Sequence, residues 1–72
     1  MPTINGHNVV AGANLTGADI SNGDLTGVNL TGCNFTNANL TNCNFTGANL
    51  TNVTFTGATV SGLKPANGFG VT

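Results

Sequence analysis

Apolar residues occupy every fifth position of this chain between residues 13 and 62, with no insertion in the run. The other positions around each apolar centre repeat as well. A small apolar residue and then Asn, Asp or Thr precede the centre, while Thr or Ser and then Gly or Asn follow it. A period of five differs from the 3.6-residue period of a helix, and it leaves segments too short for an ordinary β-meander. The ten centres are Leu15, Ile20, Leu25, Leu30, Phe35, Leu40, Phe45, Leu50, Phe55 and Val60.

The Gly or Asn that ends each unit predicts one turn per unit. These two residue types adopt positive φ at the lowest cost, and a type II turn requires positive φ at its third residue. If each turn redirects the chain by about a right angle, four units close a square, and successive coils lie at the strand spacing of about 4.8 Å. The pattern therefore predicts an all-β fold, a four-sided parallel β-solenoid of about 2.5 coils with about 20 residues per coil. The ten centres would form its core.

Single units also resemble a known motif. Ala-Asn-Leu-Thr-Gly at 13–17 and Ala-Asn-Leu-Thr-Asn at 38–42 are similar to the repeat of the pentapeptide repeat proteins, which is a small residue, Asp or Asn, Leu or Phe, and two variable positions. The resemblance covers 13–62 and implies a right-handed quadrilateral β-helix, the handedness coming from the resemblance alone. The best-known activity of that family is DNA mimicry against type II topoisomerases, which depends on a long acidic rod. This chain departs from that pattern in both length and charge.

The segments on either side of the clean repeat are expected to cover the ends of the coil, as terminal repeats of stacked folds commonly do. Residues 1–12 form a lead-in with a degenerate first repeat at 8–12, and Asn-Gly at positions 5 and 6 predicts a tight hairpin. Residues 63–72 form a C-terminal cap or tail, because Pro65 falls where the next centre would be. The possible assembly contacts in these segments are Ile4, Val9, Val10, Leu63 and Phe69.

Charge excludes several classes of partner. The chain has one Lys, two Asp and a formal net charge of −1. It therefore offers no basic stripe for the phosphates of nucleic acid and no polybasic patch for a membrane surface. No apolar run approaches the length needed to cross a bilayer, and the first residues lack a charged segment followed by an apolar one, so we expect no Sec-type signal peptide in this chain.

Candidate chemistry is sparse. Asp19 and Asp24 are the only carboxylates and have no basic neighbour in the pattern, so we expect each to bond within its own turn. His7 is expected to be a surface or capping residue. Cys33 and Cys43 match no metal or redox spacing, and they fall on opposite sides of the predicted square, too far apart for a disulfide. We therefore expect two free buried thiols, no catalytic residue, no metal, no cofactor and no small-molecule substrate.

The remaining interpretation is a non-enzymatic structural or interaction module. Low charge and a short solenoid with apolar ends favour self-association. We expect a building block or decorating component of a larger assembly, such as a head-to-tail filament, an extracellular fibre or a virion, which binds copies of itself or another assembly protein through its coil ends. One alternative is that the regular Asn and Thr faces bind ice or a glycan. The other, a topoisomerase inhibitor, is disfavoured by charge and length.

Overall fold

The chain opens with a β-hairpin. The computed structural model describes residues 2–65, in which β1 (Thr3–Ile4) pairs antiparallel with β2 (His7–Asn8). Asn5 and Gly6 form the loop between them, with φ of 49° and 85°. Positive φ at both loop residues is the type I′ geometry that Asn-Gly favours. The hairpin that the sequence predicts at this position is confirmed.

After the hairpin the chain turns at every fifth residue. Each residue at this spacing from Gly12 to Gly62 has positive φ, between 58° and 77°. In each turn the following amide donates to the carbonyl three residues earlier, at 2.9–3.3 Å, beginning with Ala13 to Val10 and ending with Leu63 to Val60. One positive φ at the third residue together with this hydrogen bond is what a type II turn requires. Gly and Asn at these positions therefore set the path of the backbone.

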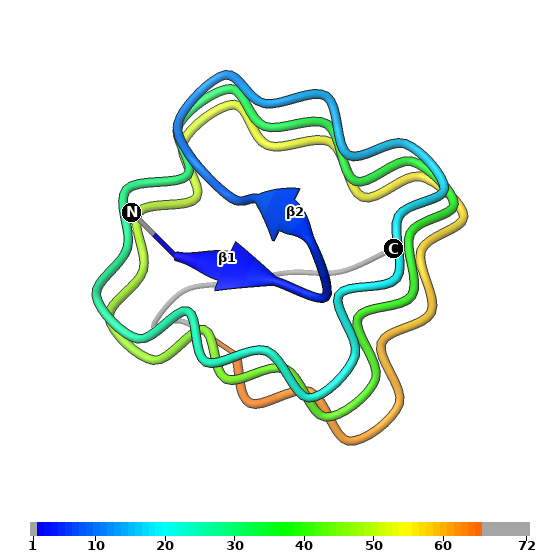
Figure 1. The fold of residues 1–72 in the computed structure, drawn as a ribbon. Helices are drawn as coiled ribbons and strands as arrows, with labels where there is room; N and C mark the ends of the chain where they lie inside the picture. Colours follow the sequence, from blue (N-terminus) through cyan, green and yellow to red (C-terminus); the bar gives the residue numbers. More distant parts are fainter. Residues whose placement is uncertain (1, 66–72) are drawn as a thin grey trace.

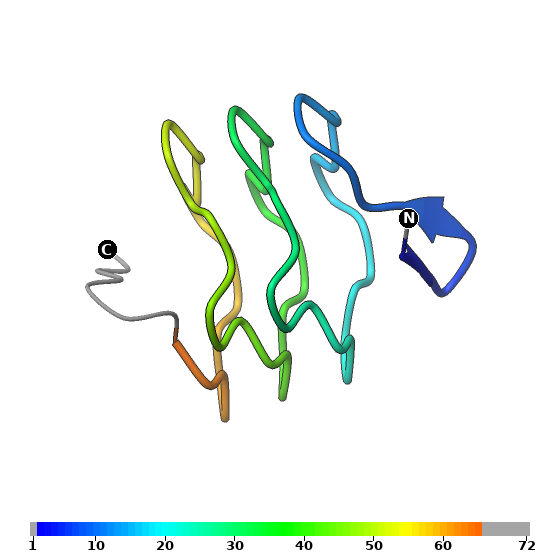
Figure 2. The ribbon, with the colours of Figure 1, turned by 90° about the vertical axis from the view of Figure 1, so that its left-hand side faces the viewer.

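Between turns, each extended segment pairs with the equivalent segment of the next coil. The parallel bridges are Asn14 with Asn34, Asp19 with Asn39, Asp24 with Asn44, Asn29 with Asn49, Asn34 with Thr54, Asn39 with Thr59 and Asn44 with Lys64. Around each bridge the backbone bonds in both directions; for example, the Leu15 amide donates to Asn34 and the Asn34 amide donates to Ala13. Figure 1 looks along the resulting coil, and Figure 2 shows its successive turns stacked side by side. The chain is a β-solenoid.

Strand length is limited by the turns. Each parallel contact is an isolated bridge, because a turn interrupts the extended segment after a few residues. Within residues 2–65 only β1 and β2 therefore count as strands, although parallel pairing continues through the repeat. We refer below to residues 10–29 as the first coil, 30–49 as the middle coil and 50–64 as the last coil. Positions that follow one another through the bridges form a column.

Apolar centres fill the inside of the coil. Leu15 is 4% exposed, and the six centres from Ile20 to Phe45 are fully buried. The three centres of the last coil, Leu50, Phe55 and Val60, are only partly buried and pack against this core. The centres from Leu15 to Phe45 are therefore buried, whereas the three centres of the last coil are only partly buried.

Aromatic side chains stack along one column of the coil. The rings of Phe35 and Phe55 are stacked, with centroids 5.6 Å apart and planes 11° apart. Phe45 approaches both rings edge-on, at 6.1 and 6.2 Å. Edge-to-face and stacked pairs at these distances add to the stabilisation from burial alone.

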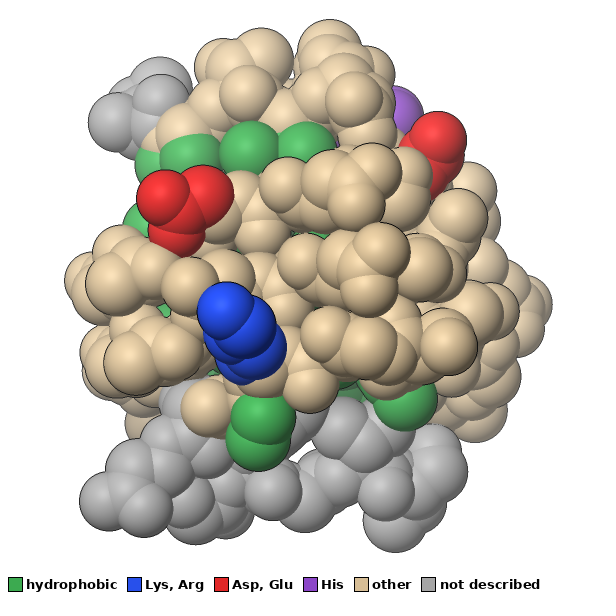
Figure 3. Space-filling model, turned by 90° about the horizontal axis from the view of Figure 1, so that it is seen from below, with side chains coloured by type: hydrophobic (Ala, Val, Ile, Leu, Met, Phe, Trp, Pro, Cys, Tyr) green, Lys and Arg blue, Asp and Glu red, His purple; other side chains and the backbone are tan. Residues whose placement is uncertain are grey.

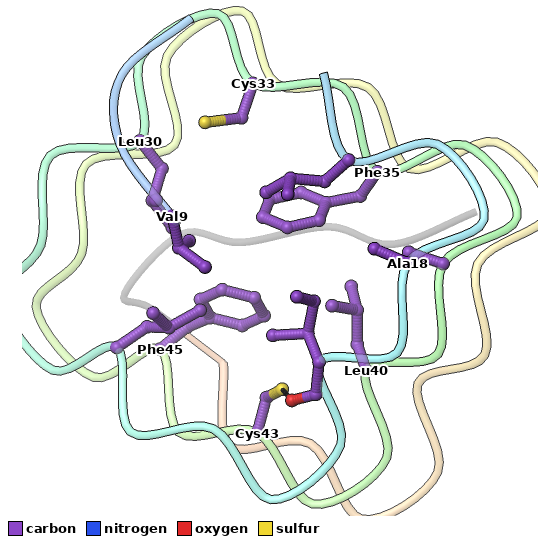
Figure 4. Packing of buried hydrophobic residues seen from close by; sticks show 12 residues of the cluster. Val9, Ala18, Leu30, Cys33, Phe35, Leu40, Cys43 and Phe45 are labelled. Carbon is purple, nitrogen blue, oxygen red and sulfur yellow. Dashed lines mark hydrogen bonds between the residues drawn. The ribbon is translucent and has the colours of Figure 1, made fainter. Parts of the chain in front are cut away.

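Both thiols are buried and free, on opposite sides of the coil (Figure 4). Cys33 Sγ donates to the Val10 carbonyl and Cys43 Sγ donates to the Ile20 carbonyl, each at 2.9 Å. Each acceptor is the carbonyl of a turn in the preceding coil, which also receives that turn's own amide. Burial raises the pKa of the Cys43 thiol, so this thiol stays protonated and serves as a small core residue.

The ladder extends past the expected C-terminal boundary of the repeat. Lys64 bridges to Asn44, its amide donates to Cys43, and its carbonyl accepts from the Phe45 amide, both bonds at 2.8 Å. Backbone pairing does not depend on the side chain, so Lys64 fills the Asn/Asp position of a further unit. At the other boundary, Asn8 belongs to β2, so the degenerate repeat expected at 8–12 begins inside the hairpin.

Candidate functional site

The outer polar faces are built from a repeated contact within each unit. The Oδ1 of the Asn or Asp accepts the amide hydrogen of the residue two positions later, at 3.0–3.2 Å, in every unit from Asn14 to Asn49. Where that later residue is Thr, its hydroxyl also donates to the same oxygen, at 2.5–2.7 Å. The Thr hydroxyl protons are thus committed inside the unit and are not presented to a ligand.

The two carboxylates make the same contact as the Asn side chains. Asp19 accepts from the amide of Ser21, and Asp24 accepts from the amide and hydroxyl of Thr26. Hydrogen bonds from Ser21, with a smaller contribution from the charge of His7, lower the pKa of Asp19, and hydrogen bonds from Thr26 lower that of Asp24. A carboxyl with a lowered pKa is a poor general acid at neutral pH. Both residues therefore stabilise their local turns, as the sequence predicts.

Other kinds of site are not found in the described part of the chain. Residues 2–65 contain no group of three side chains that could hold a metal ion and no pocket. Over the same range no helix is long and apolar enough to cross a membrane. On the face drawn in Figure 3, the few charged side chains stand apart among uncharged polar ones. The candidate surfaces are therefore the two ends of the coil.

The N-terminal end is closed by the hairpin, which lies across the mouth of the coil (Figure 1). Ile4 packs against the buried core. A Cβ on Gly23 would lie 2.9 Å from the carbonyl oxygen of Ile20 and 3.2 Å from Cγ2 of both Ile20 and Ile4, so Ile4 of the hairpin packs beside a position that has little room for a side chain. At the tip, Nδ2 of Asn5 donates to the carbonyls of Asp19 and Ser21, at 3.1 and 3.4 Å. The hairpin therefore covers both apolar surface and backbone acceptors of the first coil.

The carbonyls that Asn5 covers belong to the outer edge of the first coil. One coil later in the same column, the equivalent carbonyls of Asn39 and Thr41 accept from the backbone amides of the preceding coil. The Asn5 side chain thus replaces amides that a preceding coil would have supplied. Sequence reasoning missed this role, because the contact depends on where the hairpin comes to lie.

The C-terminal end of the coil differs from the N-terminal end in the burial of its apolar side chains and in its backbone hydrogen bonds. Leu50, Val60 and Leu63 are partly buried at this end of the core. Within residues 2–65, the amides of Leu50, Val60 and Gly62 have no backbone acceptor, although the amides at the equivalent positions of the middle coil are all bonded. The last coil therefore presents apolar side chains next to backbone donors that a further coil would pair.

The predicted assembly contacts separate into two groups. Ile4, Val9 and Val10 lie at the hairpin end, and Leu63 lies at the opposite end with the last coil. Val9 is 0% exposed, which corrects its place in this set: its side chain is part of the core and is not available to a partner. Phe69 lies outside the described residues.

Gly23 and Asn5 had weak sequence signals. Gly23 is the only Gly among the residues that lie two positions before the ten centres, which are otherwise Ala, Val and Cys. That exception marks the place where another segment approaches the coil. For Asn5, the Asn-Gly dipeptide predicts the turn but not the second function of the Asn amide.

Comparison with known proteins identifies the repeat. A search of curated proteins found no match to this chain. The family model for pentapeptide repeats matches residues 10–32 and 33–64, in 8 copies. The matched residues include every turn and every parallel bridge of the coil. The chain therefore belongs to the pentapeptide repeat family.

Proposed function

We propose that this chain is a non-enzymatic module of a larger assembly, which it joins through its last coil. Pentapeptide repeat proteins are generally structural or interaction proteins without catalytic activity. The observation that carries the more specific proposal is the difference between the two coil ends. The hairpin covers one end, while the last coil combines half-buried apolar centres with backbone donors that have no backbone acceptor within residues 2–65. Its partner is a second copy or another assembly protein.

The closed N-terminal end favours a decorating or terminating component over a head-to-tail filament. A solenoid grows by adding coils at its ends, and an end covered by another element cannot pair with a further coil. With one end covered, a chain can join an assembly but cannot extend it. The low net charge supports association, since there is little like-charge repulsion between copies.

We infer in addition that the coil is right-handed and four-sided, with about 2.5 coils. Four columns of bridges, which begin at Asn14, Asp19, Asp24 and Asn29, support the four sides. The handedness is supported by the two ribbon views. The repeat winds clockwise in Figure 1, and the rotation to Figure 2 places its N-terminal end nearer the viewer of Figure 1. A coil that winds clockwise as it recedes is right-handed.

The other functions receive less support. An ice or glycan surface needs polar groups that are free to bind, whereas the Thr hydroxyls from Thr16 to Thr51 donate to their own Asn or Asp in seven units. DNA mimicry needs dense negative charge, about one per 1.7 Å of duplex axis, and the chain has two Asp. We propose neither function.

Sedimentation equilibrium of the full chain tests the proposed docking end. We expect association at high micromolar concentration, weakened about tenfold or more by Val60→Asp, which places a charge among the half-buried centres of the last coil. Thr56→Asp is the matched control, because it adds the same charge to an exposed turn of the same coil and should leave association unchanged. A wild-type chain that stays monomeric at all concentrations would exclude a second copy as the partner, and equal effects of the two substitutions would contradict the proposed docking end.

A further inference from the structure

We propose that the β1–β2 hairpin is an autoinhibitory plug that prevents a second copy of this chain from stacking its last coil on the first coil. The hairpin would thus conceal a head-to-tail interface between copies. This inference rests on the proposed function in one respect, that the last coil is the docking end. It adds the partner, the register and the element that blocks the contact.

The two ends of the coil are complementary in their backbone donors and acceptors. Inside the chain, the amide of a centre donates to the carbonyl of the residue that precedes the equivalent centre of the next coil, as Ile20 does to Asn39 and Leu40 does to Thr59. Continued into a second copy, this pattern pairs the Val60 amide with the Asp19 carbonyl of that copy. The Gly62 amide pairs in the same way with the Ser21 carbonyl. In the reverse direction, the Asp19 amide of the second copy meets the Ala58 carbonyl.

The hairpin already binds the Asp19 and Ser21 carbonyls that such a second copy would use. Asn5 Nδ2 donates to Asp19 O at 3.1 Å and to Ser21 O at 3.4 Å. An intermolecular coil and the hairpin therefore compete for the same two acceptors. The competition extends to the apolar surface, since Ile4 packs against the core at the mouth, over Gly23. In the stacked arrangement Val60 of the first copy would lie over Ile20 of the second, at the same mouth.

The charges of Lys64 and Asp24 favour one register of the stack. Asp24, Asn44 and Lys64 form one column of parallel bridges. In the register that pairs Val60 with Asp19, the next residue in this column after Lys64 is Asp24 of the second copy, one strand spacing of about 4.8 Å away. Opposite charges directly across a strand pair are favourable, and like charges in that position are unfavourable. The only Lys and one of the two Asp of the chain thus favour the same register.

The test opens the plug without deleting residues. Asn5→Asp keeps a residue type that tolerates the positive φ of 49° but replaces the amide donor with a carboxylate that faces two carbonyl oxygens. Ile4→Asp/Asn5→Asp also places a charge at the mouth of the coil. Asn37→Asp is the matched control, because Asn37 has a φ of 58° at a turn of the middle coil, away from both ends. Circular dichroism would show which variants retain the fold.

We expect the folded Asn5→Asp chain to assemble at a concentration about tenfold or more below that of Asn37→Asp, as read by sedimentation velocity. Negative-stain microscopy should show linear rods. Adding Lys64→Asp to the open variant should abolish the rods, because it places two carboxylates together at the junction. If the double variant unfolds, Asn5→Asp alone decides the test. A folded Asn5→Asp that associates no more than the control would overturn the proposal, as would rods that persist with Lys64→Asp.

The two proposals fail in different ways. If the plug proposal is wrong but the last coil is the docking end, Asn5→Asp will behave as Asn37→Asp while Val60→Asp still weakens association of the full chain. If the docking end is wrong, Val60→Asp will behave as Thr56→Asp. In that case any rods formed by the open variant would also tolerate Val60→Asp.

Discussion

The two ends of this solenoid are made from the same repeat but are completed differently. At the N-terminal end the hairpin covers the mouth, and Ile20 and Leu25 of the first coil are fully buried. At the other end, Val60 lies in the same column as Ile20 but is only partly buried, and Leu50 is partly buried as well. Composition cannot explain this difference, since both ends carry aliphatic centres in the same repeat. Among residues 2–65, the hairpin covers the first coil and no element covers the last, which accounts for the difference.

The comparison shows that the stability of a short solenoid is unevenly distributed. Each coil contacts only its neighbours, so a coil with a neighbour on both sides gains twice the interface of a terminal coil. The hairpin acts as a substitute neighbour for the first coil. The middle coil should therefore be the most stable part of the chain, followed by the first coil and then the last.

The largest effect is expected for paired Phe substitutions in one column. Phe35 is fully buried in the middle coil, and Phe55 is partly buried in the last coil, directly stacked on it. Phe35→Ala should lower the free energy of unfolding by about 3–5 kcal/mol, and Phe55→Ala should lower it by less, because less surface is lost from the core. Urea unfolding measures both. Equal losses, or a larger loss for Phe55→Ala, would show that the last coil is as well packed as the middle one.

A smaller effect is expected where the hairpin rests on the coil. Gly23→Ala introduces a Cβ that would lie 2.9 Å from the carbonyl oxygen of Ile20 and 3.2 Å from Cγ2 of Ile4, so both the local turn and the hairpin must shift, at a cost of about 1–2 kcal/mol. Ile4→Ala removes Cγ2 of Ile4. A double-mutant cycle should show that Gly23→Ala lowers the free energy of unfolding by less in the Ile4→Ala chain than in the wild-type chain. The free energy of unfolding of the four chains gives the coupling. If the losses in free energy of unfolding are additive, the cost of Gly23→Ala does not come from contact with Ile4.

The smallest effect is expected from the two carboxylates. Hydrogen bonds from Ser21 and Thr26 lower the folded-state pKa values of Asp19 and Asp24 below the ordinary value of about 3.9. Their contribution to stability is therefore present above the unfolded-state pKa and is lost as pH falls through the lowered folded-state values. Unfolding should be nearly independent of pH above about 5 and become slightly easier in more acidic solution.

Asp19→Asn/Asp24→Asn is the matched control for this acid effect. It keeps the Oδ1 acceptor that the other units already use, but it removes the titration. The acid dependence should disappear in this chain, as read from the thermal midpoint at several pH values. An acid transition of unchanged size in the double variant would assign the effect to other groups.

Much of the interior can be predicted from the five repeating positions of the sequence. Gly or Asn at every fifth position predicts the turns, because few other residues adopt positive φ readily, and apolar centres predict the core. Burial of Cys33 and Cys43 on opposite sides follows from their places two residues before a centre and two units apart in a four-sided coil. The partial burial of Phe55 agrees with the expectation that a short solenoid has apolar ends, because a terminal coil has a neighbouring coil on one side only.

The ends were harder to predict than the interior. The contact of Asn5 with Asp19 and Ser21 joins segments far apart in the sequence and depends on how the hairpin folds back. Val9 enters the core instead of remaining at the surface for the same reason. Lys64 continues the ladder because backbone bonds do not require the repeat side chain, whereas the sequence pattern marks the end of the repeat by side chains alone.

Residue-resolved hydrogen exchange tests the central claim, that successive coils stack in the register of the parallel bridges and that the last coil carries donors without a backbone acceptor among residues 2–65. Ile20, Leu40 and Val60 belong to one column. The first two donate their amides to Asn39 and Thr59, at 2.8 and 2.7 Å, while Val60 has no backbone acceptor within residues 2–65. In a dilute full chain, we predict slow exchange at Ile20 and Leu40 and fast exchange at Val60. Val60 exchanging as slowly as Ile20, or all three exchanging fast, would contradict the account.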